Sequence, residues 1–288
     1  MRTGSKLGAF GFALAAIFVA ALFVGRSAGP IDVGSASGGE HSSMPVASDD
    51  VRGLAVADGG LRLELADDVL PADEPAQFEF RILDEVGDPV TAFDELHERN
   101  LHLVVLSRNL VDYRHLHPTM DGSGSWTIQL PALAPGSYRV FADFQAAGHE
   151  PLTLGADLVV PGSVEAPVVP PPVRSYDADG YHVTLTGHTL VGESTISFAV
   201  TKDGEAVRTE PYLGAAGHLV AIRTGDLAFL HVHPLHGDDG DTDITFAAEF
   251  PSAGTYRLFL DFAHDGDVRT ASFTVDVAAE PAMEGGGH

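Results

Sequence analysis

The chain of 288 residues contains no cysteine. This absence excludes disulfide bonds, thiolate metal sites and a catalytic cysteine. Basic residues are also scarce. The chain has 16 lysines and arginines but 41 aspartates and glutamates, which gives a formal net charge of −25. Nucleic acids are bound through clustered basic side chains, so this composition argues against a nucleic-acid partner. The negative charge instead favours solubility and attracts cations to the surface.

Sequence signatures of catalysis are missing as well. The chain has no Gly-x-Ser-x-Gly motif, no phosphate-binding loop and no dinucleotide fingerprint. We therefore predict that the protein is not an enzyme. A metal-dependent hydrolase is the least favoured of the functions considered, since it would need an open coordination position beside a substrate pocket.

The longest apolar run, Leu7–Val24, follows Arg2 and Lys6. Its eighteen residues are just enough to cross a bilayer as a helix, so we predict a membrane anchor. The basic flank predicts a cytoplasmic N-terminus and an extracytoplasmic body. Small residues at Ser27–Gly29 leave cleavage of a signal peptide open, in which case the body would be secreted.

The remainder is an internal duplication. His115 follows His102 by thirteen positions and begins a His-x-His-Pro motif, and His231 follows His218 by the same spacing and begins a second one. Further on, "APGSYRVFADF" is repeated as "SAGTYRLFLDF". The predicted organisation is a signal or transmembrane segment (1–25), a flexible linker (26–56), a first repeat (57–160), a proline-rich linker (161–175), a second repeat (176–278) and a flexible tail (279–288).

Each repeat is predicted to be all-β. Segments such as "LRLELA", "LHLVVLS" and "SYRVFADF" alternate apolar and polar residues over four to eight positions, and Pro, Gly and Asp separate them. This pattern predicts two tandem antiparallel β-sandwich domains of the immunoglobulin type after the N-terminal helix. Tyr138 and Tyr256 are expected to face the core at equivalent corners and to bond nearby backbone through their hydroxyl groups. Trp126 is expected in the core.

The histidines at these motifs indicate metal binding. If His102–Ser107 and Asp112–His117 form a hairpin, Val104 faces His115, and His102, His115 and His117 project from one face. The same register would align His218, His231 and His233 in the second repeat, giving one site in each domain. The candidate ligands are His102, His115, His117, Met120 and Asp143 in the first repeat and His218, His231, His233, His236 and Asp261 in the second.

The residue types at these positions favour copper. Met120 and His236 are equivalent, and imidazole with thioether favours Cu(I), while imidazole alone also suits Zn(II), the second candidate. Asp143 and Asp261 could be ligands or acceptors for an imidazole N–H. The alternative is that the histidines are packing residues of a structural or interaction module. His97, His149, His182, His188 and His264 have no counterpart in the other repeat and are expected to be surface or loop residues.

The pattern "HLHLVVLSRNLVDYRHLHP…GSWTIQL…APGSYRVFADF" resembles a family of bacterial exported or membrane-anchored proteins described loosely as heavy-metal-binding, and it is similar to YtkA- and FixH-type sandwich modules. The resemblance implies an extracytoplasmic sandwich in a metal-handling context. Together with the spacing of the histidines, it predicts a membrane-anchored protein that binds a copper-type ion for buffering, delivery or resistance. Its expected partners are the membrane and other metal-handling proteins.

Overall fold

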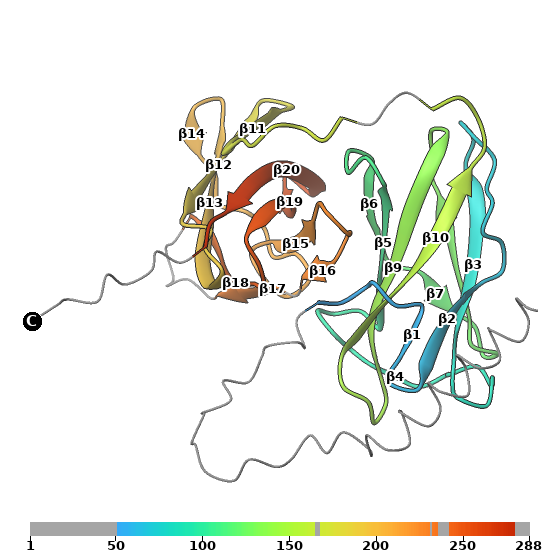
Figure 1. Ribbon diagram of the computed structural model, residues 1–288. Coiled ribbons are helices and arrows are strands. Elements are labelled where there is room, and N and C mark those ends of the chain that lie inside the picture. The colour runs from blue at the N-terminus through green and yellow to red at the C-terminus, as the bar shows by residue number, and fades with distance from the viewer. Residues whose placement is uncertain (1–50, 165–167, 231, 236–241, 280–288) are drawn as a thin grey trace, which may run out of the picture. The chain divides into compact units, whose positions relative to one another are not determined.

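The computed structural model describes residues 51–164, 168–230, 232–235 and 242–279. These residues form twenty strands and contain no helix, so no described helix could cross a membrane. The strands fall into two successive groups, coloured blue to yellow-green and yellow to red in Figure 1. The predicted anchor Leu7–Val24 lies outside the described residues.

The first repeat consists of two antiparallel sheets. Its first sheet has the order β1 (Ala57–Asp58), β2 (Leu61–Leu65), β3 (Ala76–Leu83), β8 (Ser125–Leu130) and β7 (Thr119–Met120). Its second sheet has the order β10 (Leu152–Val160), β9 (Gly136–Ala146), β5 (Leu101–Ser107) and β6 (Tyr113–Leu116), and β4 (Phe93–Asp94) pairs with β9. In β2 the buried Leu61 and Leu63 alternate with exposed polar residues, as expected for a strand with one face on the core and the other in solvent.

The second repeat has the same plan. Its first sheet has the order β11 (Ser175–Ala178), β12 (Tyr181–Gly187), β13 (Gly192–Lys202), β18 (Ile244–Phe250) and β17 (Val232–Leu235), and β14 (Glu205–Ala206) pairs with β13. Its second sheet has the order β16 (Phe229–Leu230), β15 (His218–Arg223), β19 (Gly254–His264) and β20 (Asp267–Val277).

The strand order is that of an immunoglobulin-like sandwich. In the first repeat β2, β3, β8 and β7 take the places of strands A, B, E and D, and β5, β9 and β10 take those of C, F and G. The second repeat reproduces this order with β12, β13, β18 and β17, and with β15, β19 and β20. The predicted fold class, two tandem antiparallel immunoglobulin-like sandwiches, is confirmed.

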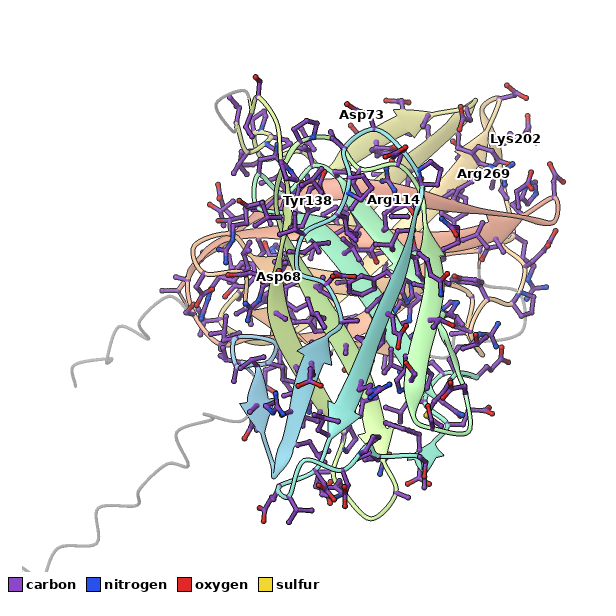
Figure 2. The ribbon with its side chains drawn as sticks, turned by 90° about the vertical axis from the view of Figure 1, so that its right-hand side faces the viewer. Asp68, Asp73, Arg114, Tyr138, Lys202 and Arg269 are labelled. Carbon is purple, nitrogen blue, oxygen red and sulfur yellow. The ribbon has the colours of Figure 1, made fainter. Side chains whose placement is uncertain are left out.

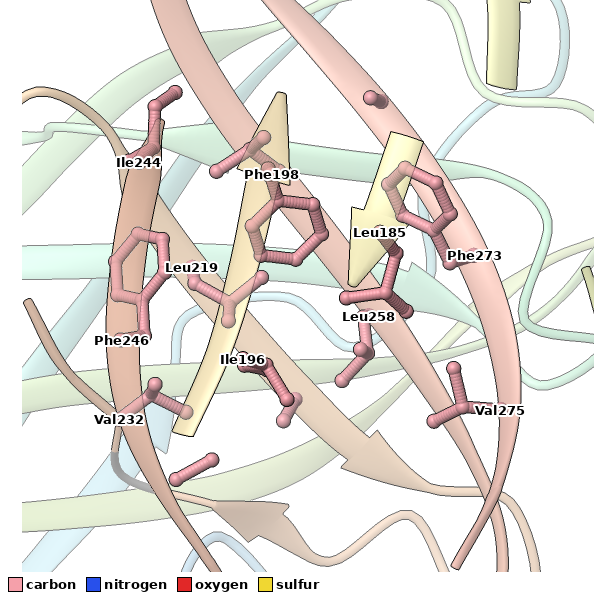
Figure 3. Packing of buried hydrophobic residues seen from close by; sticks show 14 of the residues in the cluster. Leu185, Ile196, Phe198, Leu219, Val232, Ile244, Phe246, Leu258, Phe273 and Val275 are labelled. Atoms are coloured by element: carbon pink, nitrogen blue, oxygen red, sulfur yellow. The ribbon is translucent and has the colours of Figure 1, made fainter. Parts of the chain in front are cut away.

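Each sandwich has a hydrophobic core of its own. The core of the first repeat includes Trp126, which is 2% exposed, as predicted. In the second repeat Phe198 and Phe246 from one sheet meet Leu258 and Phe273 from the other (Figure 3). No residue belongs to both cores. Each repeat is therefore organised as a separate folding unit.

Both predicted tyrosine corners are present at the start of the F strand of each sandwich. The hydroxyl of Tyr138 donates to the carbonyl of Ala134 at 2.9 Å, and that of Tyr256 donates to the carbonyl of Ser252 at 2.8 Å. Tyr138 also lies 3.1 Å from Asp112, which binds Arg114, and Figure 2 shows Tyr138 and Arg114 near one another. The tyrosine corner, in which the hydroxyl bonds to backbone a few residues upstream, is a hallmark of immunoglobulin-like domains.

Replacing Tyr256 by phenylalanine is expected to lower the free energy of unfolding by about 1 kcal/mol, because the carbonyl of the half-buried Ser252 loses its donor while the ring still fills its site. Equilibrium unfolding in urea measures this change. Tyr176→Phe, at a half-buried tyrosine outside the corners, is the control and should change the free energy by less than about 0.5 kcal/mol. An equal loss in both variants would show that the corner bond contributes nothing particular.

Candidate metal centre

The first His-x-His-Pro motif folds in the predicted register. Strands β5 and β6 pair with Val104 opposite His115 and Leu103 opposite Leu116. On its other side β5 pairs with β9, where His102 lies opposite Asp143. The predicted hairpin is therefore confirmed for the first repeat.

The second motif folds differently, and the predicted pairing of His218 with His233 is wrong. Strand β16 pairs with β15 only through Phe229 and Leu230, and β17 pairs with β18, where His233 lies opposite Ala247. The chain changes sheets between Leu230 and Val232. His233 consequently lies exposed on the other sheet. His231 and His236 lie outside the described residues.

Histidines of both repeats gather in one place. One ring nitrogen from each of His102, His115 and His218 lies within 4.8 Å of the other two. The rings of His102 and His218 stack at a centroid distance of 5.4 Å, and those of His115 and His218 at 4.7 Å. The sequence pattern predicted one site in each domain, whereas this group draws on both domains. We call His97, His102, His115, His117 and His218 the histidine cluster.

The outer nitrogens of two of these rings are held by fixed acceptors. Nε2 of His102 donates to the carbonyl of Leu96 at 3.0 Å, and Nδ1 of His115 donates to the Asp261 carboxylate at 2.8 Å. The side chains of His115 and Asp261 are only 2% and 3% exposed. The inner nitrogens, Nδ1 of His102 and Nε2 of His115, lie 3.0 Å apart, and with both outer nitrogens donating, the inner nitrogens of the neutral rings carry lone pairs. A carbonyl or carboxylate behind each imidazole is the arrangement that orients histidine ligands of metals.

The cluster also contains a buried nitrogen without a partner. Nε2 of His117 is buried and has no hydrogen-bond partner among the described residues. Its ring lies 5.0 Å from that of His102 and 4.9 Å from that of His115. A buried polar atom with no partner is unfavourable and rare, so His117 is the next ring to consider as a ligand.

The imidazoles of His102, His117 and His218 are held in the neutral form, because the pKa of each is lowered. Burial, followed by repulsion from His115, lowers the pKa of His102 to about 4. The same two causes lower the pKa of His117 to about 3 and hold that of His218 well below its ordinary value. A neutral imidazole has the lone pair that a metal ion requires, so these rings need not lose a proton at pH 7 before they bind one.

His97 lies in a turn, as predicted, and it also belongs to the cluster. Its ring lies 6.1 Å from that of His102 and 5.6 Å from that of His218. His97 and Glu98 have positive φ angles in a two-residue turn closed by bonds between Leu96 and Arg99. The second repeat has the same turn, but Leu213 replaces His97. The five-residue spacing to His102 was the signal, and its absence from the second repeat concealed it.

The two aspartates have unequal roles. Asp143 and Asp261 occupy equivalent register positions, and each accepts a bond from a threonine of the adjacent strand, Thr153 and Thr270. Asp261 in addition binds His115, a residue of the other repeat. In the described structure Asp261 therefore orients His115, while Asp143 lies opposite His102 in the sheet.

Met120 sits in β7 opposite Trp126 and packs against the hydrophobic core of the first repeat. The three nitrogens that converge within 4.8 Å of one another are all imidazole nitrogens. His149, His182 and His188 are exposed, as expected, and His264 bonds to Tyr181 in the second repeat.

An apolar layer lies beside the cluster where the two repeats meet. We call it the junction cluster; it consists of Val104, Leu106, Leu110, Tyr113 and Phe141 of the first repeat and Val220, Ile222, Leu227, Phe229 and Phe259 of the second. Tyr113 stacks on Phe259 with ring centroids 4.1 Å apart. Nε of the buried Arg257 donates to the carbonyl of Leu110 at 3.0 Å, which adds a polar bond across this layer.

Fold and site together define a tandem immunoglobulin-like protein with a histidine cluster shared between its domains. The chain belongs to the family described as domain of unknown function DUF8832, whose model matches residues 55–157 and 176–279. Each match covers one repeat. No curated protein matches the sequence.

Solved structures with similar folds are distant. The adhesin FdeC of Escherichia coli is 15% identical with a TM-score of 0.25, and the match covers 78% of this chain and 66% of that one. Titin domains I67–I69 are 12% identical with a TM-score of 0.21, over 77% and 66% of the two chains. Salmonella alpha-2-macroglobulin is 14% identical with a TM-score of 0.28, over 79% of this chain and 15% of that one.

Proposed function

We propose that the protein binds a divalent transition-metal ion in the histidine cluster, without turnover. The observation that carries this proposal is the convergence of one nitrogen each from His102, His115 and His218. The acceptors behind His102 and His115 support it, because they leave the inner nitrogens to face one another. His117 is the proposed fourth ligand, since its buried Nε2 has no partner among the described residues.

The donor set narrows the choice of metal. Zn(II) binds imidazole nitrogen at about 2.0–2.1 Å in tetrahedral geometry, which places ligand atoms about 3.3 Å apart. The 3.0 Å between the nitrogens of His102 and His115 is close to that spacing. Imidazole sites suit Zn(II) and Cu(II), whereas Cu(I) is selected by thioether or thiolate sulfur. Because the converging donors are imidazole nitrogens, we propose Zn(II) or Cu(II) as the cargo.

The cellular role follows from the predicted location. A membrane-anchored chain with its repeats outside the cytoplasm would buffer the ion or pass it to other metal-handling proteins. The formal charge of −25 would concentrate divalent cations near the site.

Calorimetric titration of the full chain with Zn(II) and Cu(II) tests the proposal. We expect one equivalent to bind with micromolar or tighter affinity, and His102→Ala, His115→Ala and His218→Ala each to weaken binding at least 100-fold. His149→Ala and His188→Ala change exposed histidines outside the cluster and are the matched controls. Absence of binding, or binding that the three cluster variants retain, would refute the proposal.

A second candidate function is a non-catalytic interaction module of tandem immunoglobulin-like domains. The bond between His115 and Asp261 favours it, because it joins the two repeats without an ion. In that case the histidines contribute polar packing at the junction, and the cluster variants would lower stability while metal ions leave the protein unchanged. The same titrations therefore separate the two candidates.

A further inference from the structure

The contact between the repeats is self-complementary. Tyr113 of the first repeat packs on Phe259 of the second, and the equivalent residues Phe229 and Phe141 pack on each other at 5.5 Å. His102 and His218, which are also equivalent, stack on each other with an interplanar angle of 7°. Such reciprocal contacts define an isologous interface, the kind that two copies of one subunit form around a two-fold axis.

This contact is separable from the folding of either domain. The junction cluster shares no residue with the core of the first or the second repeat. The polar bonds between the two sandwiches include those of Asp261 with Tyr113 and His115 and that of Arg257 with Leu110.

The proposed metal site lies across the same contact. His102 and His115 come from the first repeat, and His218 comes from the second. The carboxylate that orients His115 also comes from the second repeat. Separation of the repeats would remove one ligand and one orienting group together, so neither repeat alone presents the three-nitrogen group.

We propose that the metal ion acts as a clamp between the two repeats. It binds the docked form, so metal binding and the docking of the repeats are coupled equilibria. This inference rests on the proposed metal-binding function. An ion that binds only the docked form shifts the ratio of docked to undocked molecules in proportion to its concentration over its dissociation constant. At a hundredfold excess over that constant, the ratio should rise about 100-fold.

Distance measurement between spin labels tests the clamp, and the lack of native cysteine makes the labelling specific. Val86→Cys and Val268→Cys place one label on each repeat, at side chains that are 81% and 51% exposed. The distance distribution of the full chain is measured in chelator and in diamagnetic Zn(II), with calorimetry on the same sample. We expect a broad distribution in chelator and a single narrow one in Zn(II).

His218→Ala is the informative variant, because it leaves both ligands of the first repeat in place. It should retain weak Zn(II) binding, yet its distance distribution should stay broad in Zn(II). Zinc binding by the unchanged chain with identical distributions in chelator and zinc would overturn the clamp and leave the metal site standing. Failure of the unchanged chain to bind zinc at all would overturn both proposals.

Discussion

Lowering the pH of the metal-free protein from 6.5 to 5 is expected to reduce its free energy of unfolding by about 3 kcal/mol. The pKa of His102 is lowered to about 4 and that of His117 to about 3, in both cases chiefly by burial. In the unfolded chain both groups titrate near 6.5. The unfolded state therefore binds more protons than the folded state between pH 6.5 and about 4.

The sign of the effect follows from this difference. Stability is fully present above pH 6.5 and falls as the pH decreases, by about 1.4 kcal/mol per pH unit for each histidine. The lowered pKa of His218 acts in the same direction. Asp143 partly opposes the shift at His102, while Arg99 adds to the shift at His117.

Urea unfolding between pH 7.5 and 5 in the presence of chelator measures the slope. His117→Asn should reduce the slope by about 1.4 kcal/mol per pH unit, because it removes one titrating group. His149→Ala removes an exposed histidine and should leave the slope as it is. A stability that is constant between pH 7 and 5 would contradict the neutral, buried state of these rings.

Replacing Asp261 by asparagine is expected to weaken binding of Zn(II) by 10- to 100-fold. The carboxylate accepts the bond from Nδ1 of His115 at 2.8 Å and thereby directs Nε2 towards the inner nitrogen of His102. An amide keeps the shape of the side chain but loses the negative charge that increases the basicity of the imidazole.

The duplication supplies a matched control for this change. Asp143→Asn alters the equivalent position, where the carboxylate bonds to Thr153 in the way that Asp261 bonds to Thr270. We expect a loss of affinity below about threefold there, measured by calorimetry under the same conditions. Equal losses in the two variants would mean that the contact with His115 has no special effect on the metal site.

Much of the fold could be predicted from local patterns. Alternation of apolar and polar residues located the strands, and the repeated "YR" segments located the tyrosine corners. The register of β5 and β6 followed from the length of the hairpin. These features depend on residues that are close in sequence or that the duplication shows twice.

The features that were missed depend on contacts between the repeats. The exchange of sheets between Leu230 and Val232 is a separate case, because the equivalent stretch of the first repeat stays in its hairpin and alternation of residues does not distinguish the two. His102, His115 and His218 come close together because the two sandwiches dock against each other. Alignment of the repeats predicted equivalent residues in equivalent roles, whereas His115 and Asp261 pair between repeats.

The self-complementary junction has an evolutionary consequence. In a dimer of identical chains every substitution occurs on both sides of the two-fold axis, so the two halves of a central site stay identical. Once the copies are joined in one gene, each side can change alone. His97 belongs to the cluster in the first repeat, and Leu213 occupies the equivalent position in the second. The two halves of the fused chain therefore already differ at this position, whereas two identical subunits would not.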